Sequence, residues 1–227
     1  MKENSLSYGQ ELFNQKKYSD ALAFFLSLSS DSEEENIEIA YYLGLSYAKL
    51  SRYEDALVYL EQVVTSSDDK ERVLQCRFIL AVIYSISGRK RLASFELETL
   101  LEAHYKSELV YAALAFISWE ESDVEKCLGY YEKSLSENPD NITALNGIGY
   151  VLACEEKDLT RALSFCKRAV DFSPNSAACL DSLGCVYYKL VLFDAARKYL
   201  EKASAIDGSR IEIARHLRAL SLVGENA

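Results

Sequence analysis

The stretch NPDNITALNGIGYVLACEEKDLTRALSFCKRAVDFSPNS, residues 138–176, decides the fold of this chain. Its two prolines, Pro139 and Pro174, are the only prolines in the sequence and lie 35 residues apart. Between them, apolar residues recur at helical spacing in two segments, 144–154 and 159–172, which predicts two amphipathic helices joined by a short turn. If this stretch is one unit of a repeat, the same pattern should recur on both sides of it.

A small residue does recur along the whole chain at nearly this period. The steps between successive copies are 35, 37, 34, 35 and 34 residues, and the copies are Ala21, Ala56, Ala93, Cys127, Ala162 and Ala196. A second small residue precedes each copy by 12 or 13 positions, and these are Gly9, Gly44, Ala81, Ala115, Gly149 and Gly184. Small residues on facing helices allow close packing. The spacing therefore predicts six helix-turn-helix units.

Two segments carry a more specific pattern. LGLSY (residues 43–47) and LGCVY (residues 183–187) are each followed by an alanine and a leucine at the same offsets. This pattern resembles the tetratricopeptide repeat, a helix-turn-helix unit of 34 residues, and the resemblance covers about residues 2–208. It implies an all-α, right-handed superhelical solenoid of six repeats. The expected repeats are about 2–36, 37–73, 74–107, 108–141, 142–176 and 177–208.

Two departures from a regular repeat are expected. The fifth unit has one extra residue in its turn, within residues 156–158. After the sixth unit, residues 209–227 form a capping helix and tail. Because a stacked array leaves an apolar face on its last unit, we expect that helix to cover it with an apolar stripe. The expected stripe consists of Ile211, Ile213, Ala214, Leu217, Leu220 and Leu222.

The family resemblance also implies which residues face inward. In such solenoids the first helix of each unit lines the concave side, and in this chain the inward positions are mostly apolar or aromatic. We expect contacts with a partner from Tyr41, Tyr42, Leu45, Phe78, Val82, Phe116, Trp119, Asn146, Tyr150, Asp181 and Tyr188. The lysine, arginine and asparagine set with which some family members hold the C-terminal carboxylate of large heat-shock chaperones is absent, since Asn146 alone does not form it.

An aromatic groove of this kind suits an apolar or amphipathic peptide of a partner protein, with Trp119 and Tyr150 as anchors. We therefore expect a non-catalytic protein-protein interaction scaffold. The alternative is a structural protein whose inward rings pack within the superhelix or whose groove is filled by homo-oligomerisation. The apolar turn at residues 190–193 is either a further contact surface or packs against the capping helix.

Neither catalysis nor metal binding is indicated by the sequence. Only two histidines occur, His104 and His216, and neither has a cysteine or carboxylate at a recognisable ligand spacing, so both are expected at the surface. We expect no enzyme activity, no cofactor and no metal. Six cysteines without a Cys-x-x-Cys pair are expected to be reduced core residues, and these are Cys76, Cys127, Cys154, Cys166, Cys179 and Cys185.

Charge and hydropathy limit the partners. The net charge is −10, and no run of lysine and arginine could neutralise several phosphates, so nucleic acid is not an expected partner. No segment approaches the ~20 apolar residues that a membrane span needs, and the first residues lack the apolar core of a signal peptide. Membrane insertion is therefore not expected, and a cytoplasmic location is.

Overall fold

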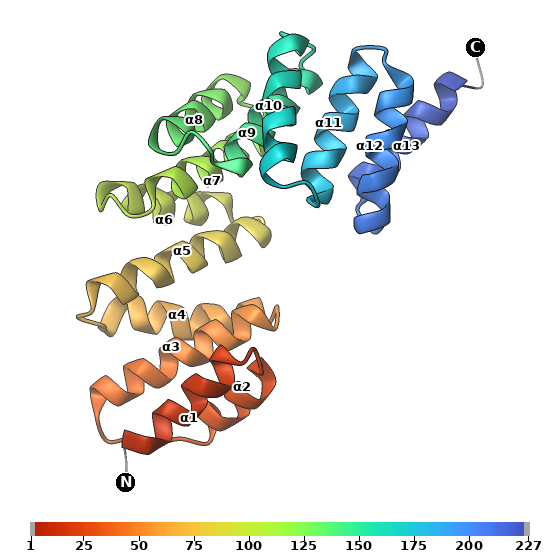
Figure 1. Cartoon of the computed structure of the whole chain (residues 1–227). Coiled ribbons are helices and arrows are strands. Elements are labelled where there is room, and N and C mark those ends of the chain that lie inside the picture. Colours follow the sequence, from red (N-terminus) through yellow and green to blue (C-terminus); the bar gives the residue numbers. More distant parts are fainter. Residues whose placement is uncertain (1–2, 225–227) are drawn as a thin grey trace. The chain divides into compact units, whose positions relative to one another are not determined.

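The computed structural model describes residues 3–224, and this part of the chain contains thirteen α-helices and no strand (Figure 1). The predicted all-α class is confirmed. The helices are α1 (Glu3–Asn14), α2 (Tyr18–Leu26), α3 (Glu33–Lys49), α4 (Tyr53–Ser66), α5 (Lys70–Ile86), α6 (Lys90–Glu102), α7 (Ser107–Glu120), α8 (Val124–Glu137), α9 (Ile142–Cys154), α10 (Leu159–Phe172), α11 (Ala177–Lys189), α12 (Phe193–Ile206) and α13 (Ile211–Gly224).

The helices belong to two compact units, which are described separately. The N-terminal unit contains α1 to α6 and ends at Lys106, and the C-terminal unit begins at Ser107 and contains α7 to α13. In both units, each odd-numbered helix from α1 to α11 packs against the even-numbered helix that follows it. This pairing is the helix-turn-helix pattern that the sequence predicts.

The predicted small residues lie at the contacts within these pairs. All six of the small residues that recur in the even-numbered helices, from Ala21 to Ala196, are completely buried. A Cβ atom on Gly44 would lie 2.8 Å from Leu60 Cδ2, and one on Gly184 would lie 2.7 Å from Leu200 Cγ. Real Cβ atoms do not approach neighbours this closely, so the missing side chain is what lets each leucine pack against the facing helix.

The turns within the pairs share a backbone conformation. Each contains a residue with positive φ at an equivalent position, and these residues are Lys16, Ser51, Gly88, Ser122, Glu156 and Val191. Five of the turns have three residues between the helices, whereas the turn between α9 and α10 has four and contains a second positive-φ residue, Asp158. The extra residue predicted in this turn is therefore confirmed.

Side-chain caps fix where α9 and α11 begin. Asn141 Oδ1 accepts a hydrogen bond from the Ala144 amide at 2.9 Å, and Ser176 Oγ accepts one from the Cys179 amide at 3.3 Å. Such caps satisfy amides that have no partner inside the helix. Because Asn141 is the cap, α9 begins at Ile142, two residues before the predicted start, while α10 has its predicted bounds.

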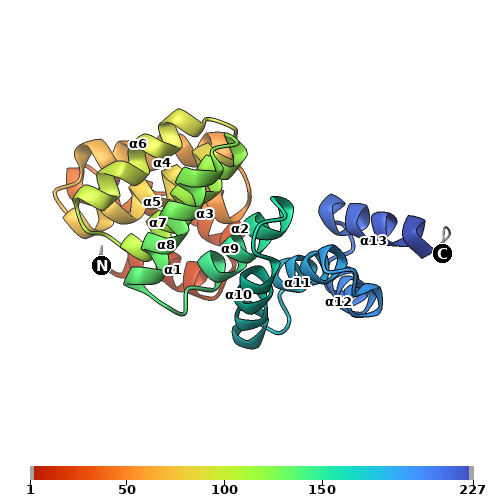
Figure 2. The ribbon, with the colours of Figure 1, turned by 90° about the horizontal axis from the view of Figure 1, so that it is seen from above.

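In the C-terminal unit the odd-numbered helices form one layer. Contacts run in series from α7 to α9, from α9 to α11 and from α11 to α13, and α13 also contacts α12. Figure 2 gives a second view, with α13 beside α11 and α12. The helix α13 thus packs on the preceding helices, as expected of a capping helix, and it also extends the layer of odd-numbered helices.

The expected apolar stripe of α13 is only partly correct. Ile213 and Leu220 are buried and Leu217 packs beside them, but Ile211 is 78% exposed and Leu222 is also exposed. The expected member Ala214 is exposed too. The error arose because α13 contacts α11 and α12 along a narrow face, so the outer apolar residues remain in solvent. The predicted tail at 225–227 lies outside the described residues.

Candidate functional site

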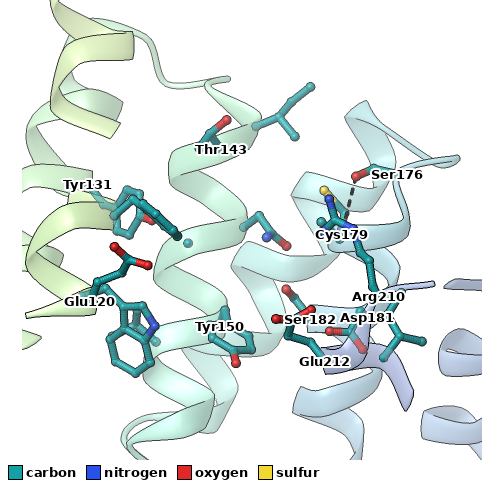
Figure 3. A pocket seen from close by; sticks show the side chains of 18 of the residues that line it. Glu120, Tyr131, Thr143, Tyr150, Ser176, Cys179, Asp181, Ser182, Arg210 and Glu212 are labelled. Atoms are coloured by element: carbon teal, nitrogen blue, oxygen red, sulfur yellow. Dashed lines mark hydrogen bonds between the residues drawn. The ribbon is translucent and has the colours of Figure 1, made fainter. Parts of the chain in front are cut away.

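A cavity of about 760 Å³ lies in the C-terminal unit. Side chains from α7, α9 and α11 line it, together with Tyr131 of α8 and residues at the start of α13. In Figure 3, Glu120 and Tyr131 lie on one side of Tyr150, and Asp181 and Arg210 lie on the other. The cavity is therefore formed along the layer of odd-numbered helices that the family resemblance implies to face inward.

Five of the eleven predicted site residues line this cavity. They are Phe116, Trp119, Asn146, Tyr150 and Asp181. They come together because they occupy equivalent positions on successive odd-numbered helices. A sixth predicted residue, Tyr188, lines a second cavity of about 300 Å³ in the same unit, and Tyr150 lines both cavities.

Aromatic rings form one wall of the larger cavity. The rings of Trp119 and Tyr150 meet edge to face, with centroids 6.0 Å apart, and Phe116 is 46% exposed beside them. Burial raises the pKa of the Tyr150 hydroxyl above its ordinary value, so this group is a neutral hydrogen-bonding group at neutral pH. This aromatic wall presents a large apolar surface with few charged groups.

The floor of the cavity depends on a glycine. A Cβ atom on Gly147 would lie 2.2 Å from Tyr131 Cζ, so only a residue without a side chain allows the Tyr131 ring to lie here. Tyr131 is buried, and burial raises the pKa of its hydroxyl. The sequence pattern did not select Tyr131 because the family resemblance points only to first helices, whereas Tyr131 belongs to α8, the second helix of its pair.

Asn146 supplies a polar group between the rings and α11. Its Oδ1 atom is buried and has no hydrogen-bond partner among the described residues. An unpaired buried acceptor costs about 1–3 kcal/mol relative to a paired one. A hydrogen-bond donor that reached this amide would therefore gain more than a donor at a solvated surface.

The start of α13 forms a charged wall that the sequence did not predict. Arg210, Glu212 and Arg215 line the cavity. His216 Nδ1 lies 2.8 Å from Asp181 Oδ1, and the two side chains are only 14% and 9% exposed. The prediction of a surface histidine at position 216 is therefore wrong.

The repeat period contained a signal for this wall. His216 follows Asp181 by 35 residues, so one further step of the period leads from an inward position on α11 to α13. The prediction treated α13 only as a cap and did not continue the inward positions onto it. His104, by contrast, is exposed as predicted.

The remaining five predicted site residues lie in the N-terminal unit, where several are already engaged. Tyr42 stacks on Phe25 with ring centroids 5.1 Å apart and an interplanar angle of 6°. Tyr41 donates a hydrogen bond from its hydroxyl to Gln75 Oε1 at 2.7 Å, and the Arg72 guanidinium lies 5.1 Å from its ring. Burial raises the pKa of Tyr41 to about 12.

The other three residues of this set are held less firmly. The Lys106 ammonium lies 5.8 Å from the Phe78 ring, Leu45 is half-buried and Val82 is exposed. None of the five lines the large cavity, which belongs to the C-terminal unit. Their contribution to partner binding stays a prediction.

Residues 3–224 contain neither a group of side chains that could hold a metal ion nor a helix that could span a membrane. No group of three His, Cys, Asp or Glu side chains in this range is arranged so that it could hold a metal ion. No helix within the same range combines the length and the apolar character needed to cross a membrane.

The repeats match a known family model. Residues 119–177 and residues 176–206 each match a model of the tetratricopeptide repeat. A comparison with curated proteins finds no match. The matched region includes most residues that line the large cavity, from Trp119 to Ser182.

Several solved structures share the fold. The APC/C hetero-tetramer Cut9–Hcn1 matches with a TM-score of 0.74 and 17% identity, over 95% of this chain and 42% of that chain. The pilF protein of Pseudomonas aeruginosa matches with a TM-score of 0.66 and 18% identity, over 85% and 86% of the two chains. YrrB, a TPR protein with an unusual peptide-binding site, matches with a TM-score of 0.55 and 17% identity, over 82% and 94%.

At these identities the solved structures establish the fold alone, and the family follows from the repeats themselves. The matched models, the buried small residues at each helix contact and the shared all-α fold agree with one another. Residues 119–206 of this chain are tetratricopeptide repeats.

Proposed function

We propose that the large cavity of the C-terminal unit binds an apolar or amphipathic peptide segment of another protein, so that the chain serves as a non-catalytic scaffold. The observation that carries the proposal is the lining of the cavity, in which rings, small residues and one amide from successive odd-numbered helices surround about 760 Å³. Pockets of ~300–1,000 Å³ with a mostly apolar lining and a few placed polar groups are typical binding sites. The peptide-binding site of YrrB, which shares this fold, supports the same proposal.

The lining suggests what the peptide presents. Phe116, Trp119 and Tyr150 offer ring faces and edges to an apolar side chain, which is the kind of anchor that dominates interface energy. The amide of Asn146 suits a backbone group of an extended segment. Charges of both signs surround the apolar part, since Glu120, Glu212, Arg210 and Arg215 line the same cavity. We therefore expect one or two large apolar residues flanked by charged ones.

The test uses the sole tryptophan of the chain. Because Trp119 lines the cavity, its fluorescence reports occupancy without a label. Peptides are selected from a random display library on the immobilised protein, synthesised, and titrated while this fluorescence is followed. Phe116→Asp should weaken the selected peptides by about 30-fold or more, the effect of losing an anchor worth ~2 kcal/mol.

Phe172→Asp is the matched control. Phe172 also belongs to the C-terminal unit, is exposed to a similar degree (49%) and does not line the cavity. Its substitution should leave the affinities unchanged, and circular dichroism should show that both variants remain folded. Equal affinities for the Phe116→Asp and Phe172→Asp proteins would overturn the proposal.

Light scattering separates a partner peptide from self-assembly. A monomer of 25.6 kDa that binds the selected peptides supports the proposal. If the chain instead forms an oligomer that Phe116→Asp dissociates and Phe172→Asp does not, a second copy occupies the cavity and the homo-oligomeric alternative is correct.

A further inference from the structure

Two cysteines meet in the smaller cavity of the C-terminal unit. Cys154, the last residue of α9, and Cys185 of α11 both line this space of about 300 Å³, and the two helices contact each other. The two side chains lie close enough that hydrogen bonding between them is the main influence on the pKa of each thiol. The sulfur atoms of two different helices are therefore neighbours in a space large enough to admit a small molecule.

Cys154 differs from the other five cysteines in its surroundings. It is partly exposed, whereas Cys76, Cys127, Cys166, Cys179 and Cys185 are all buried. The hydrogen bond from Cys185, a second one from the Tyr150 hydroxyl and the nearby charges of His216 and Lys189 hold the pKa of the Cys154 thiol below its ordinary value. These groups stabilise the thiolate, which is the nucleophilic form.

The remaining cysteines have the opposite character. Burial raises the pKa of Cys76 and of Cys127 to about 12, and burial likewise raises the pKa of Cys166 and Cys179. The hydrogen bond to Cys154, followed by burial, raises the pKa of Cys185. One activated thiol thus lies beside one protonated thiol, and the other cysteines are inert core residues.

We propose that Cys154 and Cys185 form an oxidative modification site, in which a hydroperoxide oxidises Cys154 and Cys185 then closes a disulfide between α9 and α11. In the first step the Cys154 thiolate attacks the terminal peroxide oxygen, the O–O bond breaks, and the products are the sulfenic acid of Cys154 and an alcohol or water, which takes up one proton. In the second step the Cys185 sulfur attacks the sulfenic sulfur, the S–O bond breaks, and the thiol proton leaves with the hydroxyl as water. The pair loses two electrons to the peroxide.

The cavity contains groups suited to this chemistry. Lys189 and Arg215 supply positive charge beside the thiolate, and Lys189 is held in place by an ion pair with Glu156 at 2.6 Å. Tyr150 lines both cavities, so a chemical change at Cys154 alters the surroundings of Trp119. Oxidation should therefore alter the fluorescence of Trp119 while the protein stays folded.

The experiment treats the folded chain with a small excess of hydrogen peroxide, blocks the remaining thiols and identifies linked peptides by mass spectrometry. The first product should be a Cys154–Cys185 disulfide that a dithiol reductant reverses. In Cys185→Ser the sulfenic acid of Cys154 should persist and be trapped by dimedone, and Cys154→Ser should form neither product. Cys127→Ser, which changes a buried cysteine outside the cavity, should behave as the parent does.

Alkylation of the unmodified protein keeps the test valid if a variant fails to fold. At pH 6.5, iodoacetamide should label Cys154 at least ten-fold faster than any other cysteine. Equal labelling of all six cysteines, or oxidation that joins other pairs first, would contradict the proposal. Neither result depends on peptide binding. The proposed oxidation site can therefore be wrong while the proposed peptide binding is correct.

Discussion

The inward-facing residues of α3 and those of α7, α9 and α11 all lie on the first helix of a helix pair, yet they are used differently. In the N-terminal unit, Tyr42 is stacked on Phe25 and Tyr41 is hydrogen-bonded to Gln75. In the C-terminal unit, Phe116 and Tyr150 surround a cavity of about 760 Å³. An inward-facing aromatic residue therefore supports packing in one unit and lines open space in the other.

The size of the neighbouring residues accounts for the difference. Tyr41 and Tyr42 are adjacent in sequence, with ring centroids 5.2 Å apart, and the ring of Phe13 also meets Tyr42 at 5.7 Å. The cavity instead has Gly147 and Ser182 at positions where the N-terminal unit has bulky side chains. The lesson is that an inward position becomes available to a partner only where its neighbours are small.

The largest effect is expected from removing a ring that packs. Tyr42→Ala should lower the free energy of unfolding by about 2–3 kcal/mol, somewhat less than for a fully buried ring because Tyr42 is half-buried. Phe116→Ala, at the exposed cavity wall, should cost about 1 kcal/mol or less. Urea denaturation followed by circular dichroism measures both, and equal losses would remove the distinction between the units.

A second prediction concerns the glycine under the cavity. Gly147→Ala should destabilise the protein by about 1–3 kcal/mol and weaken peptide binding, because the new methyl group displaces the Tyr131 ring. Gly129 is the control, since a Cβ atom there meets nothing within 4 Å in the middle of α8. Gly129→Ala should stabilise the protein by about 0.5–1 kcal/mol. If both substitutions stabilise, Tyr131 moves freely and the cavity floor is not rigid.

The smallest effect is expected at a turn. Gly88 in the N-terminal unit and Val191 in the C-terminal unit occupy the same turn position, with φ of 73° and 62°. A β-branched residue is strained in this conformation, whereas glycine is not. Val191→Gly should therefore raise the free energy of unfolding by about 1 kcal/mol, measured as a higher thermal midpoint. An unchanged or lower midpoint would mean that the strain is offset by contacts of the valine side chain.

The sequence was sufficient for the features that depend on local spacing. The close packing at the recurring small residues and the extra residue in the turn before α10 were both predicted, because each follows from the period of the repeat. The family resemblance implied that Phe116 and Asn146 face inward, and both line the cavity.

Features that depend on contacts between different helix pairs could not be predicted in this way. The stacking of Tyr42 on Phe25, for example, joins α3 to α2, which belong to different pairs. Whether a ring packs or lines a cavity is decided by side chains from several helices together. The spacing of residues within one helix does not determine whether a ring packs or lines a cavity.

The wall formed by the start of α13 has a consequence for synthesis. Phe116 and Arg215 line the same cavity but are separated by about 100 residues of chain, which a ribosome adds over roughly 5–20 s. During that interval the rings of α7 and α9 have left the ribosome, whereas the start of α13, which completes the cavity, has not yet been synthesised. The nascent chain therefore exposes an unfinished apolar surface for seconds, and chaperones can bind that surface during this time.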